Sequence, residues 1–192
     1  MSSEIQNQGE DRRIELIASH IEEIIKLLGE DVTREGLVKT PVRAAKALAF
    51  ITQGYHNDSE QILQSAMFTH EGSQVVIVKD IEFYSMCEHH ILPFFGKVSI
   101  AYLPGKHIVG LSKLARLVNN CARKLQVQER LTREICTIVG KVLDCEGVMV
   151  ICDAQHLCMK MRGVEKQESS TSTMEYTGRF LTDSQLRRDV LE

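Results

Sequence analysis

The sequence of 192 residues has no long apolar run and no large excess of charge of one sign. No stretch approaches the ~20 apolar residues of a membrane span, so we expect no membrane partner. The net charge of -3 argues against a broadly basic surface for nucleic acid, although it allows a local basic pocket. Residues 1–15 are polar and contain no apolar core of a signal peptide, which predicts a cytoplasmic protein.

Internal repeats and low-complexity linkers are also missing. The composition, 43% hydrophobic and 26% charged, is typical of a soluble globular protein, and the length suits one domain. We expect one structural unit overall. Residues 1–70 form its N-terminal tail and helical segment, with 1–11 as a loose polar tail, and residues 71–192 form the main domain.

The cysteines do not resemble a disulfide framework. There are six in a chain that is neither small nor visibly secreted, so reduced thiols are expected, some of them metal ligands. Cys121, Cys136 and Cys145 lie beside aliphatic residues in helical patterns and are interpreted as small core residues.

Apolar periodicity predicts a mixed fold. Steps of three and four predict helices over 12–28, 41–54, 58–66, 112–121, 131–142 and 182–191. Short β-branched or alternating runs predict strands over 75–78, 97–103, 147–153, 156–162 and 170–178. Because strands and helices do not alternate one by one, this order favours the α+β class with an antiparallel sheet, N-terminal helices and a helix pair.

Two short segments concentrate metal ligands, Cys87-Glu88-His89-His90 and His156-Leu157-Cys158. Zinc binds thiolate sulfur and imidazole nitrogen readily, and a C-x-x-H turn can present two ligands to one ion. Cys87, His90 and Cys158 would leave one position for water, as in catalytic zinc sites. A fourth ligand from His89 or His156 would instead give a closed, structural site.

If residues 156–162 form a strand, alternate side chains share a face. One face carries His156, Cys158, Lys160 and Arg162, and the other carries Leu157, Met159 and Met161. The first face predicts a wall that holds a metal at one end and an anion at the other. Lys160 and Arg162, taken alone, are also explained as charged residues on a solvent-exposed face.

The segment Gly110–Arg116 predicts a second anion site. Ser112 at a helix start leaves backbone N–H groups free, where the helix dipole favours a phosphate. Lys113 and Arg116 oppose that dipole, so anion binding explains them better than local stability does. Glu129 has no such signal, and composition alone makes it a solvated glutamate near a helix start.

Five segments together resemble the GTP cyclohydrolase I family. They cover most of the chain from about Ile14 to Gly163, in the family's order and approximate spacing: TPVRAAKAL at 40–48, SMCEHHILPFFGKVSIAYLPG at 85–105, VGLSKLARLV at 109–118, QVQERLT at 126–132 and DAQHLCMKMRG at 153–163.

The resemblance implies zinc-dependent conversion of GTP and water to formate and 7,8-dihydroneopterin triphosphate, the first step of pterin and folate biosynthesis. It also implies the tunnelling fold, with 71–192 as the catalytic domain. In that fold, sheets join into a barrel in a ring of five subunits, and two rings form a decamer with active sites between subunits. The alternatives are another tunnelling-fold purine or pterin enzyme, or a non-catalytic zinc-binding paralogue.

The resemblance also implies roles for individual residues. Zinc (Zn²⁺) would be bound by Cys87, His90 and Cys158, and His89 and His156 would be the catalytic acid-base histidines. Gln128 and Glu129 would meet the guanine edge. The triphosphate would be held by cations and a hydroxyl from several segments: Ser112, Lys113, Arg116, Arg162, Arg43 and Lys46.

Overall fold

The computed structural model describes residues 2–72 and 74–191. Internal contacts divide the chain into two compact units, Met1–Thr52 and Gln53–Glu192. The division at residue 70 between an N-terminal helical segment and the main domain stays a prediction.

The first unit is a pair of packed helices, α1 (Ser2–Leu27) and α2 (Thr40–Ile51). Ala18 and Ile25 of α1 are buried, as are Ala45 and Ala49 of α2, so small residues form much of the contact. Pro41 lies in the first turn of α2, as expected for a residue without an N–H to donate. The loose tail expected over 1–11 is wrong, because α1 already begins at Ser2. Glu, Gln and Arg are good helix formers, and their polarity alone does not prevent a helix.

The second unit contains the remaining elements. In chain order, these are η1 (Gln53–Tyr55), α3 (Ser59–Gln64), β1 (Met67–Thr69), β2 (Val76–Cys87), β3 (Leu92–Leu103), β4 (His107–Val109), α4 (Leu111–Ala122), β5 (Leu125–Gln126), α5 (Gln128–Leu143), β6 (Gly147–His156), α6 (Leu157–Lys160), β7 (Thr171–Tyr176), α7 (Arg179–Thr182) and α8 (Ser184–Leu191).

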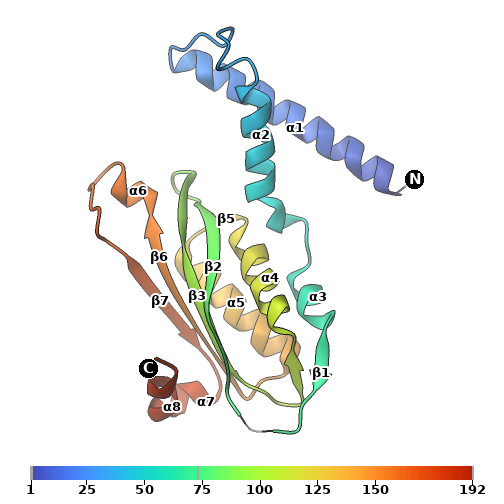
Figure 1. Ribbon diagram of the computed structural model, residues 1–192, viewed down its shortest axis with the longest axis vertical. Coiled ribbons are helices and arrows are strands. Elements are labelled where there is room, and N and C mark those ends of the chain that lie inside the picture. Colours follow the sequence, from blue (N-terminus) through green and yellow to red (C-terminus); the bar gives the residue numbers. More distant parts are fainter. Residues whose placement is uncertain (1, 73, 192) are drawn as a thin grey trace. The chain divides into compact units, whose positions relative to one another are not determined.

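The principal sheet has the strand order β5-β2-β3-β6-β7 (Figure 1). The β2–β3, β3–β6 and β6–β7 pairs are antiparallel, and only the short β5 runs parallel to its neighbour β2. The predicted α+β class with an antiparallel sheet is therefore confirmed. A second sheet pairs β1 with β4.

Helices cover the two faces of this sheet unequally. On one face, Leu114 and Leu117 of α4 and Ile135 of α5 join Phe83 and Val98 of the sheet in the larger buried cluster. On the other face, α7 and α8 cover only one end, where Phe180 and Val190 pack on sheet residues including Met149. Over the described residues, no helix combines the length and apolar character needed to cross a membrane.

The strand predictions need correction in two respects. β2 and β3 are 12 residues each, much longer than the runs 75–78 and 97–103 that alternation indicated. The predicted pair 147–153 and 156–162 is a single strand, β6, followed by the short helix α6. Leu157, Met159 and Lys160 are not branched at Cβ and are good helix formers, so the alternating face proposed for residues 156–162 does not exist.

The β3–β6 pair is unusually close at Gly96. A Cβ atom placed on this residue would lie 1.9 Å from the carbonyl oxygen of Asp153 and 2.7 Å from Cα of Ala154. Both neighbours are backbone atoms, so the contact cannot be relieved by a side-chain rotation. Only glycine fits here without moving β6.

We expect Gly96→Ala to lower the free energy of unfolding by about 1–3 kcal/mol, because β3 and β6 must separate to accept the methyl group. Urea denaturation followed by circular dichroism measures this change. Gly140→Ala is the matched control. It lies inside α5, where the nearest atom to an added Cβ is 3.6 Å away, and alanine should stabilise the helix by up to ~1 kcal/mol. An unchanged denaturation midpoint for Gly96→Ala would contradict the packing argument.

Candidate metal centre and active site

The hairpin turn between β2 and β3 carries the first group of ligands. Cys87 is the last residue of β2 and is buried, with 5% of its surface exposed. Its backbone pairs with Leu92 across the hairpin and with Gln126 of β5 on the other side. His89 and His90 occupy the turn itself, so pairing on both sides of Cys87 fixes the base of the ligand loop.

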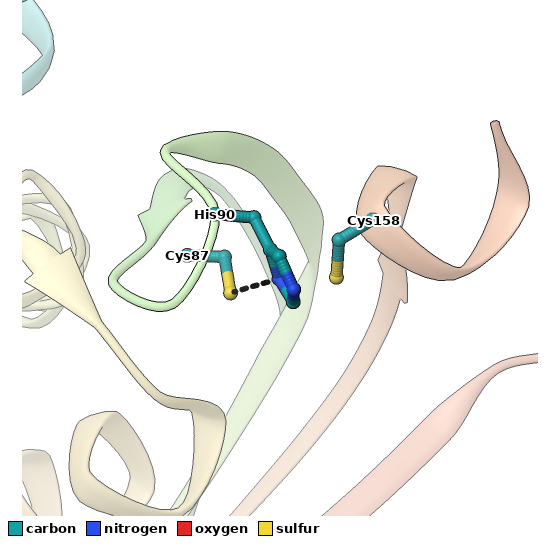
Figure 2. A group of neighbouring side chains, drawn as sticks. All are labelled: Cys87, His90 and Cys158. Carbon is teal, nitrogen blue, oxygen red and sulfur yellow. Dashed lines mark hydrogen bonds between the residues drawn. The ribbon is translucent and has the colours of Figure 1, made fainter. Parts of the chain in front are cut away.

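The third ligand comes from the end of β6. Phe94 of β3 pairs with His156, which places α6 beside the β2–β3 turn and brings Cys158 to it. Figure 2 shows Cys87 and His90 from the turn and Cys158 from α6 pointing toward one another. The helix in place of the predicted strand therefore does not remove Cys158 from the centre.

The spacing of these three side chains fits one metal ion. Their ligand atoms all lie within 4.8 Å of one another, and Cys87 Sγ is 3.9 Å from His90 Nδ1. Ligands placed tetrahedrally around one zinc ion would be ~3.5–3.8 Å apart, from bond lengths of ~2.3 Å to sulfur and ~2.0 Å to nitrogen. Small side-chain rotations close the difference. Within residues 2–72 and 74–191, this is the one such group of three.

Backbone strain is stored in the ligand turn. Ile91 has φ of +51°, although a β-branched residue strongly disfavours the left-handed region. Its N–H donates to the carbonyl oxygen of Cys87 at 2.8 Å, which closes the turn around His89 and His90. Strain of this kind costs of order 1–3 kcal/mol and persists only where the surrounding structure imposes it. Here the hairpin imposes it on the ligand loop.

The cysteines fall into two electrostatic groups. Burial first, and then the neighbouring Cys87 sulfur, raise the pKa of the Cys158 thiol, so two adjacent thiolates need a cation to be stable. The remaining four thiols lie away from this centre. Burial raises the pKa of Cys136 to about 11 and those of Cys121, Cys145 and Cys152 to about 12, which keeps these thiols protonated. Three of these were interpreted from the sequence as core residues, and their surroundings agree.

His156 is half-buried between a ring and an amide. It stacks on Phe94 with ring centroids 4.7 Å apart and an interplanar angle of 2°. Its Nε2 lies 2.8 Å from Oε1 of Gln128, the first residue of α5. Burial lowers the pKa of His156, and the nearby carboxylate of Glu129 opposes that shift in part. Glu129 itself is exposed in the first turn of α5, close enough to His156 to act on it.

His89 lies at the edge of the centre. Its Nδ1 is 4.0 Å from Cys87 Sγ, and its ring is 6.1 Å from the ring of His90 at 78°. The group of mutually close ligand atoms contains neither His89 nor His156, which leaves both imidazoles beside the three ligands rather than among them. Three protein ligands with neighbouring histidines is the pattern of an open, catalytic site.

A polar network that the sequence did not reveal supports the ligand turn. Arg130 of α5 forms an ion pair with Glu88 at 2.5 Å and donates to Gln126 Oε1 at 2.8 Å. The N–H of Glu88 in turn donates to the carbonyl oxygen of Gln126. Because Glu88 and Arg130 are 42 positions apart, no local pattern could have paired them.

The second anion site is not brought to the metal ligands within one chain. Helix α4 begins beside β1 and β4, since Gly110 N donates to Ala66 O, and ends at Ala122, whose carbonyl accepts from Ser85 near the Cys87 end of β2 (Figure 1). Its 12 residues span ~18 Å. Ser112 and Lys113 therefore lie at the far end of α4 from Cys87, with Arg116 one turn closer.

The predicted N-cap of α4 is also wrong by two residues. Gly110 is the N-cap, and Ser112 lies inside the first turn with its side chain exposed. The other predicted phosphate ligands belong to different elements. Arg162 is exposed just after α6 and acts electrostatically on Cys158. Arg43 and Lys46 are exposed on α2 in the first unit.

Taken together, the fold and the site define an α+β enzyme with a thiol-and-imidazole centre that could hold a metal ion. Sequence comparison then gives the family. The family model for GTP cyclohydrolase I matches residues 17–192, and the chain belongs to that family.

Similar curated proteins agree over nearly the whole chain. GTP cyclohydrolase 1 of Parabacteroides distasonis is 58% identical over 170 residues, covering 88% of this chain and 87% of that protein. The Porphyromonas gingivalis protein of the same name is 54% identical over 175 residues, with coverage of 91% and 90%. That of Chlorobaculum tepidum is 50% identical over 188 residues, with coverage of 96% and 84%.

Among solved structures, the apo form of an archaeosine synthase QueF-Like protein is similar to 56% of this chain and 97% of its own length. The TM-score is 0.46 and the sequence identity 14%, and a likeness at this level carries no argument.

We expect the metal-depleted protein to bind one cobalt(II) ion per chain, with a thiolate-to-cobalt charge-transfer band and the intense visible bands of tetrahedral coordination. Absorption titration measures both. Cys158→Ser should weaken binding by at least about tenfold because it removes one of three ligands. Cys145→Ser, a half-buried thiol outside the centre, is the control and should titrate like the wild type. Equal binding by the two variants would rule out the assigned ligand set.

Proposed function

We propose that this protein converts GTP and water to formate and 7,8-dihydroneopterin triphosphate, the first step of pterin and folate biosynthesis. Membership of the GTP cyclohydrolase I family supports the reaction. The observation that carries the proposal is the convergence of Cys87, His90 and Cys158 beside His156 and Glu129. We also expect the protein to act in the cytoplasm.

The donor atoms favour zinc as the resident ion. Two sulfurs and one imidazole nitrogen suit zinc better than magnesium or calcium, which prefer oxygen. When bound, zinc supplies Lewis acidity and lowers the pKa of a coordinated water to ~7. Cys87, His90 and Cys158 would hold the ion, and the hairpin around them keeps the two turn ligands in place.

The neighbouring side chains have separate tasks in this proposal. His156 would supply a proton to the guanine nitrogen that departs on ring opening, since imidazole titrates in the range needed for proton transfer. His89, on the exposed side of the turn, would be the second acid-base group. Glu129 would accept two hydrogen bonds from the N–H and amino groups of guanine. Adenine lacks that donor pair and would leave the carboxylate unpaired.

The triphosphate site points to an assembly of several chains. Ser112, Lys113 and Arg116 belong to the end of α4 that is remote from Cys87 in the same chain, so they would serve the centre of a neighbouring copy. Arg162 would contribute from the same chain as the metal ligands. Arg43 and Lys46 would complete the phosphate clamp. A homo-oligomer with sites between subunits, a decamer of two pentameric rings, explains this division.

Two further features support association of identical chains. In the described part of the chain, the outer side of β2 is paired only at Met86 and Cys87, and β7 is the opposite edge of the sheet. Open edges of this kind pair readily with another strand. Several large apolar side chains are also exposed on α1 and α2: Leu16, Ile24, Leu27, Val42 and Phe50.

The activity is tested by incubating zinc-loaded protein with GTP and measuring formate together with the ultraviolet spectrum of a dihydropterin. We expect both products, their loss on treatment with a chelator, and their return when zinc is added.

His156→Ala should retain zinc and lose at least about 100-fold in kcat, since general acid catalysis contributes a factor of ~10²–10⁴ to the rate.

Two results would overturn the proposal. Oxidation of NADPH without formate release would identify a different tunnelling-fold enzyme, and bound zinc without any turnover would identify a non-catalytic paralogue. Normal turnover by His156→Ala would leave the reaction intact and remove only the assigned acid.

We expect sedimentation equilibrium to give a mass of about 217 kDa, ten times the chain mass of 21.7 kDa.

Lys113→Ala tests whether sites are shared, because it should raise KM for GTP without changing zinc content. At a GTP concentration too low for Lys113→Ala to turn over, mixing it with His156→Ala chains and allowing subunits to exchange should restore part of the activity. A monomer, or mixed chains that stay inactive despite exchange, would exclude shared sites.

A further inference from the structure

Gln128 has a more restricted environment than a substrate-binding residue needs. It begins α5 and is 2% exposed. Its Nε2 donates to the carbonyl oxygens of Cys152 on β6, at 2.8 Å, and of Thr171 on β7, at 2.9 Å. Both amide hydrogens are therefore committed to backbone acceptors of two adjacent strands.

These two bonds determine which way the amide points. If the nitrogen and oxygen were exchanged, an amide oxygen would face two carbonyl oxygens and three acceptors would meet without a proton. That arrangement would leave buried acceptors unsatisfied, at ~1–3 kcal/mol each. The group that lies 2.8 Å from His156 Nε2 is therefore the amide oxygen, which can only accept.

We infer that Gln128 is a positioning residue for His156: its amide oxygen requires a proton on Nε2 and so leaves Nδ1 as the nitrogen that exchanges protons with the substrate. The tautomer of a histidine is set by the hydrogen bond of its other nitrogen. The inference rests on the proposed function for the role of His156, but the tautomer follows from the hydrogen bonds alone.

Phe94 fixes the remaining freedom of the ring. It is fully buried, and its ring stacks on His156 at 4.7 Å with an interplanar angle of 2°. Because Phe94 and His156 are directly paired across β3 and β6, the stack follows from the strand register. The stack on Phe94 fixes the plane of the imidazole ring. The hydrogen bond to Gln128 selects one of the two ring orientations that share this plane, the one that places Nε2 beside the amide oxygen.

The consequence for the reaction is a defined proton path. As an acid, His156 gives up the proton on Nδ1 to the departing guanine nitrogen, so one N–H bond breaks and another forms. The proton on Nε2 stays in its bond to Gln128 throughout. The ring needs no rotation to return to the neutral Nε2–H form. This assignment differs from the guanine contact that the sequence resemblance implied for Gln128.

The direct test is the tautomer of His156 in the wild-type protein. Selective ¹⁵N and ¹³C labelling of histidine, read by magic-angle-spinning nuclear magnetic resonance, distinguishes Nε2–H from Nδ1–H rings even in a large assembly. The His156→Gln variant identifies its signals among the seven histidines. We expect the neutral ring to be the Nε2–H form. A neutral ring protonated on Nδ1 would overturn the inference, whatever the enzyme's activity.

Kinetics of Gln128→Met provide the second test. Methionine fills similar space but offers no oxygen to Nε2, so kcat should fall at least about tenfold while KM for GTP stays within about twofold. Discrimination between GTP and inosine triphosphate, which lacks the 2-amino group, should be unchanged. A large rise in KM with altered discrimination would instead place Gln128 at the guanine edge.

Thr132→Val is the matched control. Thr132 is 1% exposed on the same helix and bonds to Gln128 O and to Thr173, but not to His156. Its loss of buried hydrogen bonds should leave the tautomer and kcat close to wild type. If Gln128→Met does not fold, the wild-type tautomer still decides the question. If the wild type releases no formate, the proposed function fails, and the tautomer measurement stands apart from it.

Discussion

The alignment of three antiparallel strands is the constraint on which the candidate site depends. Cys87 pairs with Leu92 across β2 and β3, and Phe94 pairs with His156 across β3 and β6. A shift of one residue in either pair would turn the side chains to the opposite face of the sheet. Gly96, two residues from Phe94, permits the close approach of β6 that this alignment requires.

The chemistry of the site is more predictable from the sequence than its architecture. The C-x-x-H spacing and a second short segment with Cys158 are enough to indicate the three ligands, because metal coordination depends on few residue types. Asp58 is likewise recognisable as a helix cap, and it accepts from the N–H groups of Glu60 and Gln61. Patterns of this kind can be recognised from the sequence because the interacting residues are only a few positions apart.

Longer-range features are not predictable, for identifiable reasons. β2 contains the exposed residues Lys79, Asp80 and Glu82, since one sheet face is open to solvent. These charges interrupt the apolar run, so the length of the strand could not be predicted from apolar residues. The prediction of a strand at α6 is wrong because four residues are too few to distinguish the two periods. The pairing of Gln128 with His156 depends on strands that meet only in the folded chain. The resemblance assigns Gln128 to the ligand, whereas in the fold both of its amide hydrogens are donated to the carbonyl oxygens of Cys152 and Thr171.

The position of Cys158 gives the metal a role in the mechanics of the chain. A bound ion would join α6 to the β2–β3 turn and so close a loop between positions 87 and 158. Cross-linking a loop of this length removes conformational freedom mainly from the unfolded chain. The segment after α6 has few buried residues of its own up to β7. The supply of the ion would then affect the lifetime of the folded chain as well as its chemistry. A chain without the ion would unfold more readily and would be degraded faster by proteases.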